Sequence, residues 1–152
     1  MVMFTDQEAT AVASITRLIF GWANEIDRNE GLGLAPYIAA DCRYMARGVP
    51  RHGPQGVVEF YTTRLEDLKQ TPAGPPTQRH VISNLIVDFT APDRARVDFL
   101  LTYYFSTMQQ PCTDMNGPLA VADVWMDCTR EADGHWRISS FDSVQNFIRA
   151  AS

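Results

Sequence analysis

The sequence predicts an α+β fold in which N-terminal helices pack on one face of an antiparallel sheet. Amphipathic helical patterns precede Pro76, and four segments rich in Val, Ile, Phe, Tyr, Trp and Thr follow it. Helices first and a run of strands afterwards is the arrangement typical of this fold class. The chain has 152 residues, 45% of them hydrophobic, which is enough for one substantial core. We therefore expect a single domain over residues 1–152.

The first expected element is a long amphipathic helix. Thr5 with Glu8 is a capping-box signature, which marks the start of a helix. An apolar stripe then recurs at alternating spacings of three and four residues, at Val12, Ile15, Ile19, Trp22 and Ile26. Gly31 and Gly33 are expected to end the helix. Because the stripe covers one side of the helix, that side must face the core.

Two shorter helices are expected next, with one strand between them. Residues 34–40 predict the second helix, which carries Pro36 in its first turn. Cys42–Gly48 is expected to be a strand, followed by a polar, Pro-containing loop. Gly53-Pro54 then opens a third helix, and its apolar positions are Val57, Tyr61, Leu65 and Leu68. This helix is expected to end before Thr71–Pro76, because prolines cannot continue it.

Four long strands are expected in the second half of the chain. They are Thr77–Phe89, Arg94–Met108, Leu119–Arg130 and Trp136–Phe147. Pro92-Asp93, the loop Gln109–Pro118 and the hairpin-turn dipeptide Asp133-Gly134 separate them. The last three are expected to be consecutive antiparallel strands.

The first of these strands is apolar on both faces. Simple alternation places Val81, Leu85, Val87 and Phe89 on one face, and His80, Ile82, Asn84 and Ile86 on the other. Helices cover only one face of such a sheet, so apolar residues on the other face predict a partner subunit. We expect a homodimer or a higher homo-oligomer through the sheet.

Charge and hydropathy exclude two classes of partner. The net charge is -5 and the basic residues are scattered, whereas nucleic-acid binding needs clustered Lys and Arg. No apolar run reaches the roughly 18 residues that a bilayer span needs. Residues 1–10 lack a positive charge followed by an apolar block, so we expect no signal peptide and a cytoplasmic location.

The cysteines give no sign of a metal or disulfide site. Cys42, Cys112 and Cys128 are widely spaced, and the chain has three histidines. Free thiols are the expected state, and Cys42 and Cys128 lie in apolar strand patterns where cysteine acts as a small hydrophobe. We expect no metal and no cofactor.

Asp27 and His80 are the candidate catalytic residues. Asp27 lies four residues after Ala23, at the edge of the buried stripe, although from the helix alone a solvated residue at a helix end is the favoured interpretation. His80 is expected to face the helix-covered interior, where an isolated histidine is more commonly a hydrogen-bonded core residue. A buried imidazole beside a carboxylate has its tautomer fixed and its cation stabilised, which suits a general base near neutral pH. No GxSxG-type nucleophile accompanies the pair, so the expected chemistry is proton transfer.

Seven further residues are candidates for binding a substrate. Aromatic walls of an apolar cavity are expected from Trp22, Tyr44, Tyr61 and Phe141, although ordinary core packing would place them similarly. Asn84 could hold a substrate oxygen, or it could be a buried amide paired with the backbone. Asp123 could be a second acid in the pocket or an outward, interfacial residue. Tyr103 and Tyr104 point to opposite faces, so one of them could supply a hydroxyl, and Tyr104 is the candidate.

The order of several short segments resembles a known family. These are Trp22–Asp27, Asp41–Tyr44, Gly53–Gly56, Thr77–Asn84 and Asp133–Ile138. Together they resemble the SnoaL-like family of the nuclear transport factor 2-like superfamily over nearly the whole chain. The resemblance implies a curved antiparallel or mixed sheet wrapped by three helices into a cone.

The resemblance also implies a use for the two candidate catalytic residues. Asp27 and His80 match the positions of the proton-abstracting dyad in the scytalone dehydratase and hexachlorocyclohexane dehydrochlorinase members. The chain departs from scytalone dehydratase because residues 94–108 contain no second histidine. It also departs from ketosteroid isomerase, since Tyr44–Gly48 offers no acidic base.

Two functions of different classes are therefore expected. The first is a cofactor-independent lyase or isomerase that acts on a small apolar, aromatic or polyketide-like molecule through Asp27 and His80. The second is a non-catalytic ligand-binding or scaffold module, similar to the small subunit of a ring-hydroxylating dioxygenase. In that case any oxygenase chemistry would belong to a partner.

Overall fold

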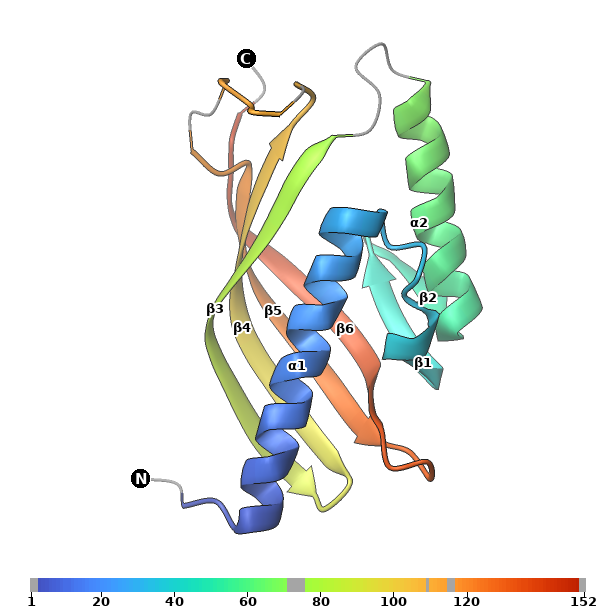
Figure 1. The fold of residues 1–152 in the computed structure, drawn as a ribbon, viewed down its shortest axis with the longest axis vertical. Helices are drawn as coiled ribbons and strands as arrows, with labels where there is room; N and C mark the ends of the chain where they lie inside the picture. The colour runs from blue at the N-terminus through green and yellow to red at the C-terminus, as the bar shows by residue number, and fades with distance from the viewer. Residues whose placement is uncertain (1–2, 71–75, 109, 115–116, 151–152) are drawn as a thin grey trace.

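A mixed sheet and two α-helices make up the part of the chain that the computed structural model describes, which is residues 3–70, 76–108, 110–114 and 117–150 (Figure 1). The helices are α1 (Asp6–Asn29) and α2 (Gly53–Lys69), and a 3₁₀ turn, η1, spans Ala35–Tyr37. The strands are β1 (Ile38–Ala46), β2 (Val49–His52), β3 (Thr77–Ala91), β4 (Arg94–Ser106), β5 (Ala120–Arg130) and β6 (Trp136–Ile148). In space their order is β2-β1-β6-β5-β4-β3, and β1 pairs with β6 in parallel while every other neighbour is antiparallel. The α+β expectation is confirmed, and the mixed sheet is not closed into a barrel.

The expectation of three helices is wrong. In place of a second helix over residues 34–40, the chain makes the three-residue turn η1 and enters β1 at Ile38. Ile38 pairs with Ile138 of β6, and this tertiary pairing outweighs a weak local helical preference. The predicted polar loop is β2, which pairs with β1 at the edge of the sheet. Pro50 is tolerated there because an edge strand does not need every N–H.

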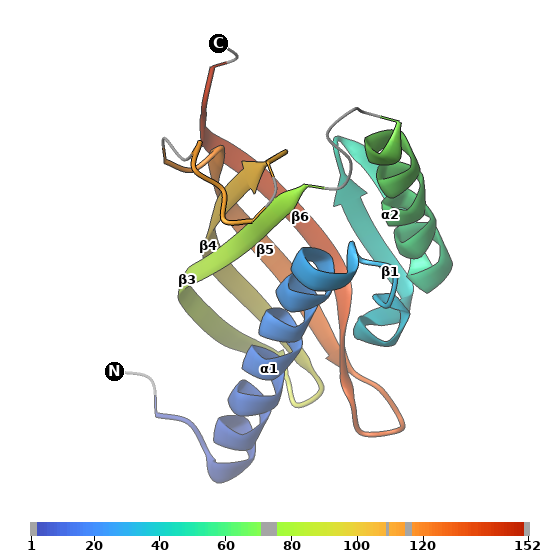
Figure 2. The same cartoon turned by 45° about the horizontal axis from the view of Figure 1, so that its top comes forward.

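Helix α1 forms as its cap and stripe predict. The Thr5 hydroxyl accepts the Glu8 N–H at 3.2 Å, and the Glu8 carboxylate accepts the Thr5 N–H at 2.8 Å. The helix ends at Asn29, where Glu30 and Gly31 adopt left-handed backbone conformations. Figures 1 and 2 show α1 lying across the hollow face of the curved strands β3–β6, while α2 lies beside β1 and β2. Among the described residues, neither helix is long and apolar enough to cross a bilayer.

A bulge in the middle of β3 reverses which residues face inward. The β3–β4 register shifts between Ser83 and Ile86, and Asn84 there has φ 54. Before the bulge Gln78, His80 and Ile82 face inward, and after it Leu85, Val87 and Phe89 do so. Val81 and Ile86 are accordingly 48% and 58% exposed on the outer face. The simple alternation expected for this strand is therefore wrong beyond Ser83.

The core lies between α1 and the concave face of the sheet. Helix α1 contributes Ile15, Ile19, Trp22 and Ile26, each at most 2% exposed, and each such side chain contributes about 1.5–3 kcal/mol by leaving water. Cys42 of β1 and Cys128 of β5 are buried in the same cluster. Burial, with smaller contributions from the neighbouring Asp41 and Asp127, raises the pKa of both thiols to about 12.

The extent to which each cysteine is alkylated in the native protein is expected to depend on its burial. A thiol whose pKa is about 12 stays protonated at pH 8, and the thiolate is the reactive form. Iodoacetamide at pH 8, followed by peptide mass spectrometry, is therefore expected to modify Cys112, which is half-buried, and to leave Cys42 and Cys128 unmodified. Full labelling of all three in urea is the control. Rapid native labelling of Cys42 or Cys128 would contradict their placement in the core.

Candidate functional site

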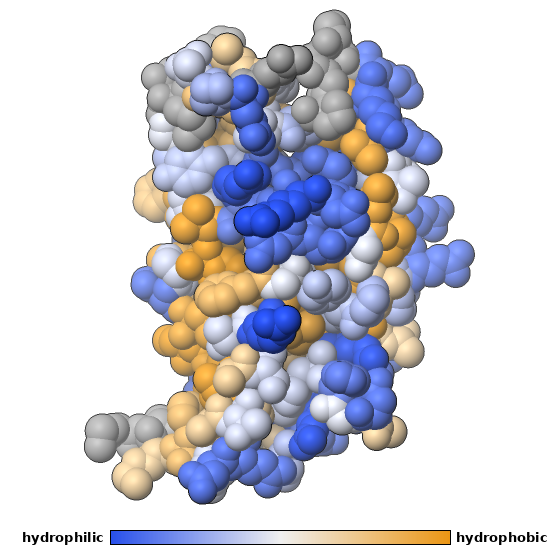
Figure 3. Space-filling view, in the orientation of Figure 1, coloured by the Kyte–Doolittle hydropathy of each residue, from blue (hydrophilic) through white to orange (hydrophobic). Residues whose placement is uncertain are grey.

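A pocket of about 390 Å³ lies between the C-terminal half of α1, helix α2 and strands β1, β3, β4 and β6. Its walls come from six elements, which supply Trp22, Tyr44, Tyr61, His80, Tyr103 and Phe141. At about 30 Å³ for each water molecule, its volume equals roughly a dozen waters, which suits a small ring compound. Figure 3 shows hydrophilic side chains gathered over the end of α1 and toward α2, with apolar surface around them.

Asp27 and His80 are joined by two hydrogen bonds at this pocket. Asp27 Oδ1 lies 2.6 Å from His80 Nδ1, and Asp27 Oδ2 accepts the His80 backbone N–H at 2.8 Å. A carboxylate only accepts, so Nδ1 carries a proton and Nε2 is the free base of the neutral ring. The side chains are 6% and 13% exposed, respectively. The two bonds also offset the unfavourable position of an aspartate in the last turn of α1.

Aromatic rings fix the orientation of the imidazole. Tyr103, which pairs with His80 across β3 and β4, lies with its ring 4.6 Å from the His80 ring and tilted by 34°. The indole of Trp22 approaches from α1, at 6.1 Å and 63°. The imidazole is therefore bounded on two sides by rings and anchored at Nδ1 by Asp27.

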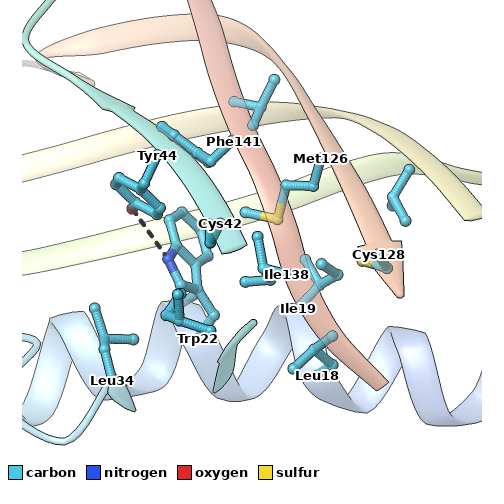
Figure 4. Packing of buried hydrophobic residues seen from close by; sticks show 14 of the residues in the cluster. Leu18, Ile19, Trp22, Leu34, Cys42, Tyr44, Met126, Cys128, Ile138 and Phe141 are labelled. Atoms are coloured by element: carbon cyan, nitrogen blue, oxygen red, sulfur yellow. Dashed lines mark hydrogen bonds between the residues drawn. The ribbon is translucent and has the colours of Figure 1, made fainter. Parts of the chain in front are cut away.

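A second wall of the pocket is a chain of hydrogen-bonded aromatic residues. Trp22 Nε1 donates to the Tyr44 hydroxyl at 3.1 Å, as Figure 4 shows, and the Tyr44 and Tyr61 hydroxyls lie 2.9 Å apart. Phe141 stacks on Tyr44 with 4.4 Å between ring centroids. The three groups hold three protons, but their two mutual hydrogen bonds use only two. One tyrosine O–H in the pocket wall is therefore left to donate elsewhere.

These hydroxyls stay protonated at neutral pH. Burial raises the pKa of Tyr61 to about 12, against the lowering effects of its hydrogen bond to Tyr44 and of the Arg64 and Arg47 charges. Burial likewise raises the pKa of Tyr44 well above its ordinary value. Both residues are thus neutral donors.

Sequence reasoning missed a polar cluster on the other side of His80. Gln78 is 1% exposed, and its amide N–H groups donate to the Ile26 carbonyl at 2.9 Å and to Glu30 Oε2 at 3.0 Å. Its carbonyl accepts from Arg64 Nη2 at 2.9 Å and from the Tyr103 hydroxyl at 3.0 Å. Arg64 Nη1 also lies 3.3 Å from Glu30 Oε2. Gln78 is two residues before His80, so strand alternation could have identified it as a neighbour in the same wall.

Three predicted pocket residues lie elsewhere. Asn84 is exposed at the β3 bulge, because the bulge turns it out of the inward row. Asp123 is exposed on the outer face of β5, between the buried Ala122 and Val124. Tyr104 is not in the pocket lining, whereas Tyr103 is, since alternate residues of β4 face inward. Of Tyr103 and Tyr104, it is therefore Tyr103 that supplies a hydroxyl to the pocket wall.

The described residues include no group of three or more His, Cys, Asp or Glu side chains arranged to hold a metal ion.

Comparison of the fold finds several similar solved structures. A hexachlorocyclohexane dehydrochlorinase, LinA-type3 from Novosphingobium barchaimii, superposes with a TM-score of 0.72 at 18% identity, covering 94% of this chain and 91% of that one. A scytalone dehydratase-like protein from Novosphingobium aromaticivorans gives 0.71 at 18% identity, covering 97% and 95%. ActVI-ORFA from Streptomyces coelicolor gives 0.74 at 12% identity, covering 93% and 99%. At these identities the likeness is one of fold.

Sequence comparison gives a more specific result. No curated protein sequence matches the chain. The family model of the SnoaL-like domain, however, matches residues 7–142, which include both helices and the wall of the pocket from Trp22 to Phe141. The chain therefore belongs to the SnoaL-like family of the nuclear transport factor 2-like superfamily.

Proposed function

We propose that this protein is a cofactor-independent lyase or isomerase that removes a proton from carbon in a small, largely apolar ring compound. The observation that carries the proposal is the 2.6 Å contact between Asp27 Oδ1 and His80 Nδ1 at the wall of a 390 Å³ pocket. An imidazole whose Nδ1–H is held by a carboxylate presents Nε2 as a base on the opposite edge of its ring. Proton transfer by such a base requires no cofactor.

Each residue of the proposed site has a defined part in the reaction. His80 Nε2 takes the proton from a carbon next to an activating group, and Asp27 stabilises the imidazolium that forms. The spare O–H of the Tyr44–Tyr61 pair donates to the carbonyl or leaving group where negative charge develops. One well-placed donor of this kind contributes up to about 3–4 kcal/mol to the transition state.

The reaction class is supported by relatives of the same fold. A hexachlorocyclohexane dehydrochlorinase and a scytalone dehydratase-like protein are both named for eliminations. The pocket volume and its aromatic walls suit an aromatic or polyketide-like substrate of one or two rings. We therefore expect elimination or isomerisation rather than hydrolysis.

Proton exchange gives the most direct test of the function. Purified protein is incubated in D₂O with 2-tetralone, whose α-carbon protons are acidic, and deuterium incorporation is followed by NMR. Scytalone and hexachlorocyclohexane serve as elimination probes, read by absorbance and by chloride release. Catalysed exchange or elimination of any probe above the rate with His80→Ala protein supports the proposal. Rates equal to that variant for all three probes would refute it.

We also propose that the exposed face of the sheet forms a homodimer. Exposed apolar residues lie on or beside this face at Val81, Val144, Phe147 and Ile148, which are 48–72% exposed. Analytical ultracentrifugation is expected to show a dimer, which Val144→Glu converts to a monomer. Phe20→Glu on α1, 45% exposed on another surface, is the matched control and should stay dimeric. A wild-type monomer would contradict the proposed dimer, and a stable complex with a larger subunit would favour the scaffold function.

A further inference from the structure

The polar groups that face the pocket are nearly all hydrogen-bond donors or cations. Its charged lining residues among those the structure describes are Arg47 and Arg64, and no carboxylate is among them. The nearby carboxylates have partners of their own. Asp27 is hydrogen-bonded to His80, and Glu30 contacts Arg64 and Gln78. With the spare tyrosine O–H, the polar part of the wall is complementary to an electron-rich oxygen group.

Among the residues that the structure describes, Arg64 at the pocket has a single salt-bridge partner, Glu30. Its side chain is 11% exposed, and Nη1 contacts Glu30 Oε2 at 3.3 Å, an oxygen that Gln78 Nε2 approaches more closely, at 3.0 Å. Its Nη2 donates to the neutral Gln78 carbonyl at 2.9 Å. Removing a guanidinium from water costs free energy unless nearby negative charges offset that cost. The single Glu30 oxygen, which Gln78 also contacts, offsets only part of it. A second anion at this site would complete the compensation.

The field of Arg64 acts on the residues that line the pocket. Burial raises the pKa of Tyr103, and the positive charge of Arg64 opposes that rise. The same charge opposes burial at Tyr61, together with Arg47. The guanidinium therefore acts on both hydroxyl-bearing walls of the cavity, and not only on its partner Glu30.

Arg47 adds a second positive charge at the pocket mouth. It is an exposed residue in the tight turn between β1 and β2, where Arg47 has φ 50 and Gly48 has φ 74. It lines the pocket and forms no salt bridge with any described residue. A cation in this place raises the local concentration of anions and speeds their entry.

From this arrangement, and building on the proton transfer proposed above, we propose that the natural substrate is an organic anion: a one- or two-ring compound that carries a carboxylate. Arg64 binds the carboxylate, which matches the planar donors of a guanidinium. The ring system packs against Phe141, Leu101 and Phe105, and its acidic C–H faces His80. Arg47 attracts the anion to the entrance.

Calorimetric titration with two probes of equal shape tests the inference. 2-Naphthoate carries the charge, and 2-naphthamide is its neutral counterpart. Wild-type protein is expected to bind naphthoate about tenfold more tightly than the amide, because a charge-assisted hydrogen bond is roughly twice as strong as a neutral one. The preference should shrink as salt is added. Equal affinities for the acid and the amide at low salt would overturn the proposal.

Two variants should move the naphthoate affinity in opposite directions. Arg64→Gln is expected to abolish the preference for the acid, with circular dichroism used to check the fold. Glu30→Gln removes the rival carboxylate and is expected to tighten naphthoate binding about threefold or more, while leaving the amide unchanged. Arg28→Gln, an exposed arginine in the last turn of α1, is the matched control and should bind like the wild type. Unchanged naphthoate affinity in both pocket variants would also overturn the proposal.

Binding and turnover are read separately in this design. Neither naphthoate nor the amide needs to react, so the titrations are repeated with His80→Ala protein. A charge preference without any catalysed exchange leaves the anion site standing and removes the proposed function. Catalysed exchange without a charge preference would support the proposed function and overturn the anion site.

Discussion

Replacing His80 by alanine, or Asp27 by asparagine, is expected to lower the rate of proton abstraction by about 10²–10⁴-fold, the usual contribution of a positioned general base. His80→Ala removes the base itself. Asp27→Asn is expected to act by changing which ring nitrogen of His80 carries the proton. The His80 backbone N–H, which now donates to Asp27 Oδ2 at 2.8 Å, would hold the amide oxygen of the substituted side chain and turn its NH₂ group toward the ring. An NH₂ group donates to Nδ1, so the proton would move to Nε2 and the pocket would face an acid instead of a base.

The measurement is the single-turnover or steady-state rate with whichever probe the wild type converts. His135→Ala is the matched control, because His135 is exposed in the β5–β6 turn, and its rate should equal that of the wild type. Circular dichroism of each variant separates loss of the base from loss of the fold. Wild-type rates in both His80→Ala and Asp27→Asn protein would eliminate the dyad.

The second large effect is expected in stability, at Gln78. This amide uses both N–H protons and accepts two hydrogen bonds at its oxygen, and it is 1% exposed. Gln78→Leu has a similar volume but leaves the Ile26 carbonyl, the Tyr103 hydroxyl and the Arg64 guanidinium each short of a partner in a buried place. Breaking such a network by removing one member costs about 3–5 kcal/mol of unfolding free energy.

Urea denaturation followed by circular dichroism measures this loss. We expect a lower midpoint with an unchanged slope, since the surface exposed on unfolding hardly changes. Gln145→Leu on β6 is the matched control, because Gln145 is exposed, and it should stay within about 0.5 kcal/mol of the wild type. A Gln78→Leu variant as stable as this control would mean that the cluster contributes little to stability.

Features with local causes could be predicted from the sequence. Helix α1 carries its own cap and a complete apolar stripe, so its start and its buried face follow from Thr5, Glu8 and the spacing of Ile15, Ile19 and Trp22. The start of β3 at Thr77 follows in the same way from a segment of β-branched and aromatic residues beyond a proline break. Of that break, Thr71–Pro76, only Pro76 lies among the described residues, and the loop Gln109–Pro118 is likewise described only in part.

The contacts that depend on the register between strands could not be predicted from the sequence. A regular hairpin continued from the Ala91–Arg94 pair would place Phe105 opposite His80, but two bulges shift the strands so that Tyr103 lies there. A single left-handed residue, Asn84, causes one of these shifts, and nothing in a period-2 pattern marks it. Arg64 was missed for another reason: an arginine on a helix is ordinarily solvated, and its burial depends on Gln78 arriving from β3.

The parallel pairing of β1 with β6 also has a consequence for synthesis of the chain. Tyr44 stacks on Phe141, so residues of β1 obtain their final neighbours only after β2, α2 and β3 to β5 have been synthesised. Closing so long a loop is slow, because its entropy is lost before the contacts form. During that interval β1 lacks its neighbour β6 and the apolar side of α1 is covered only by the strands that have already been made, so the nascent protein exposes hydrophobic segments that chaperones can shield.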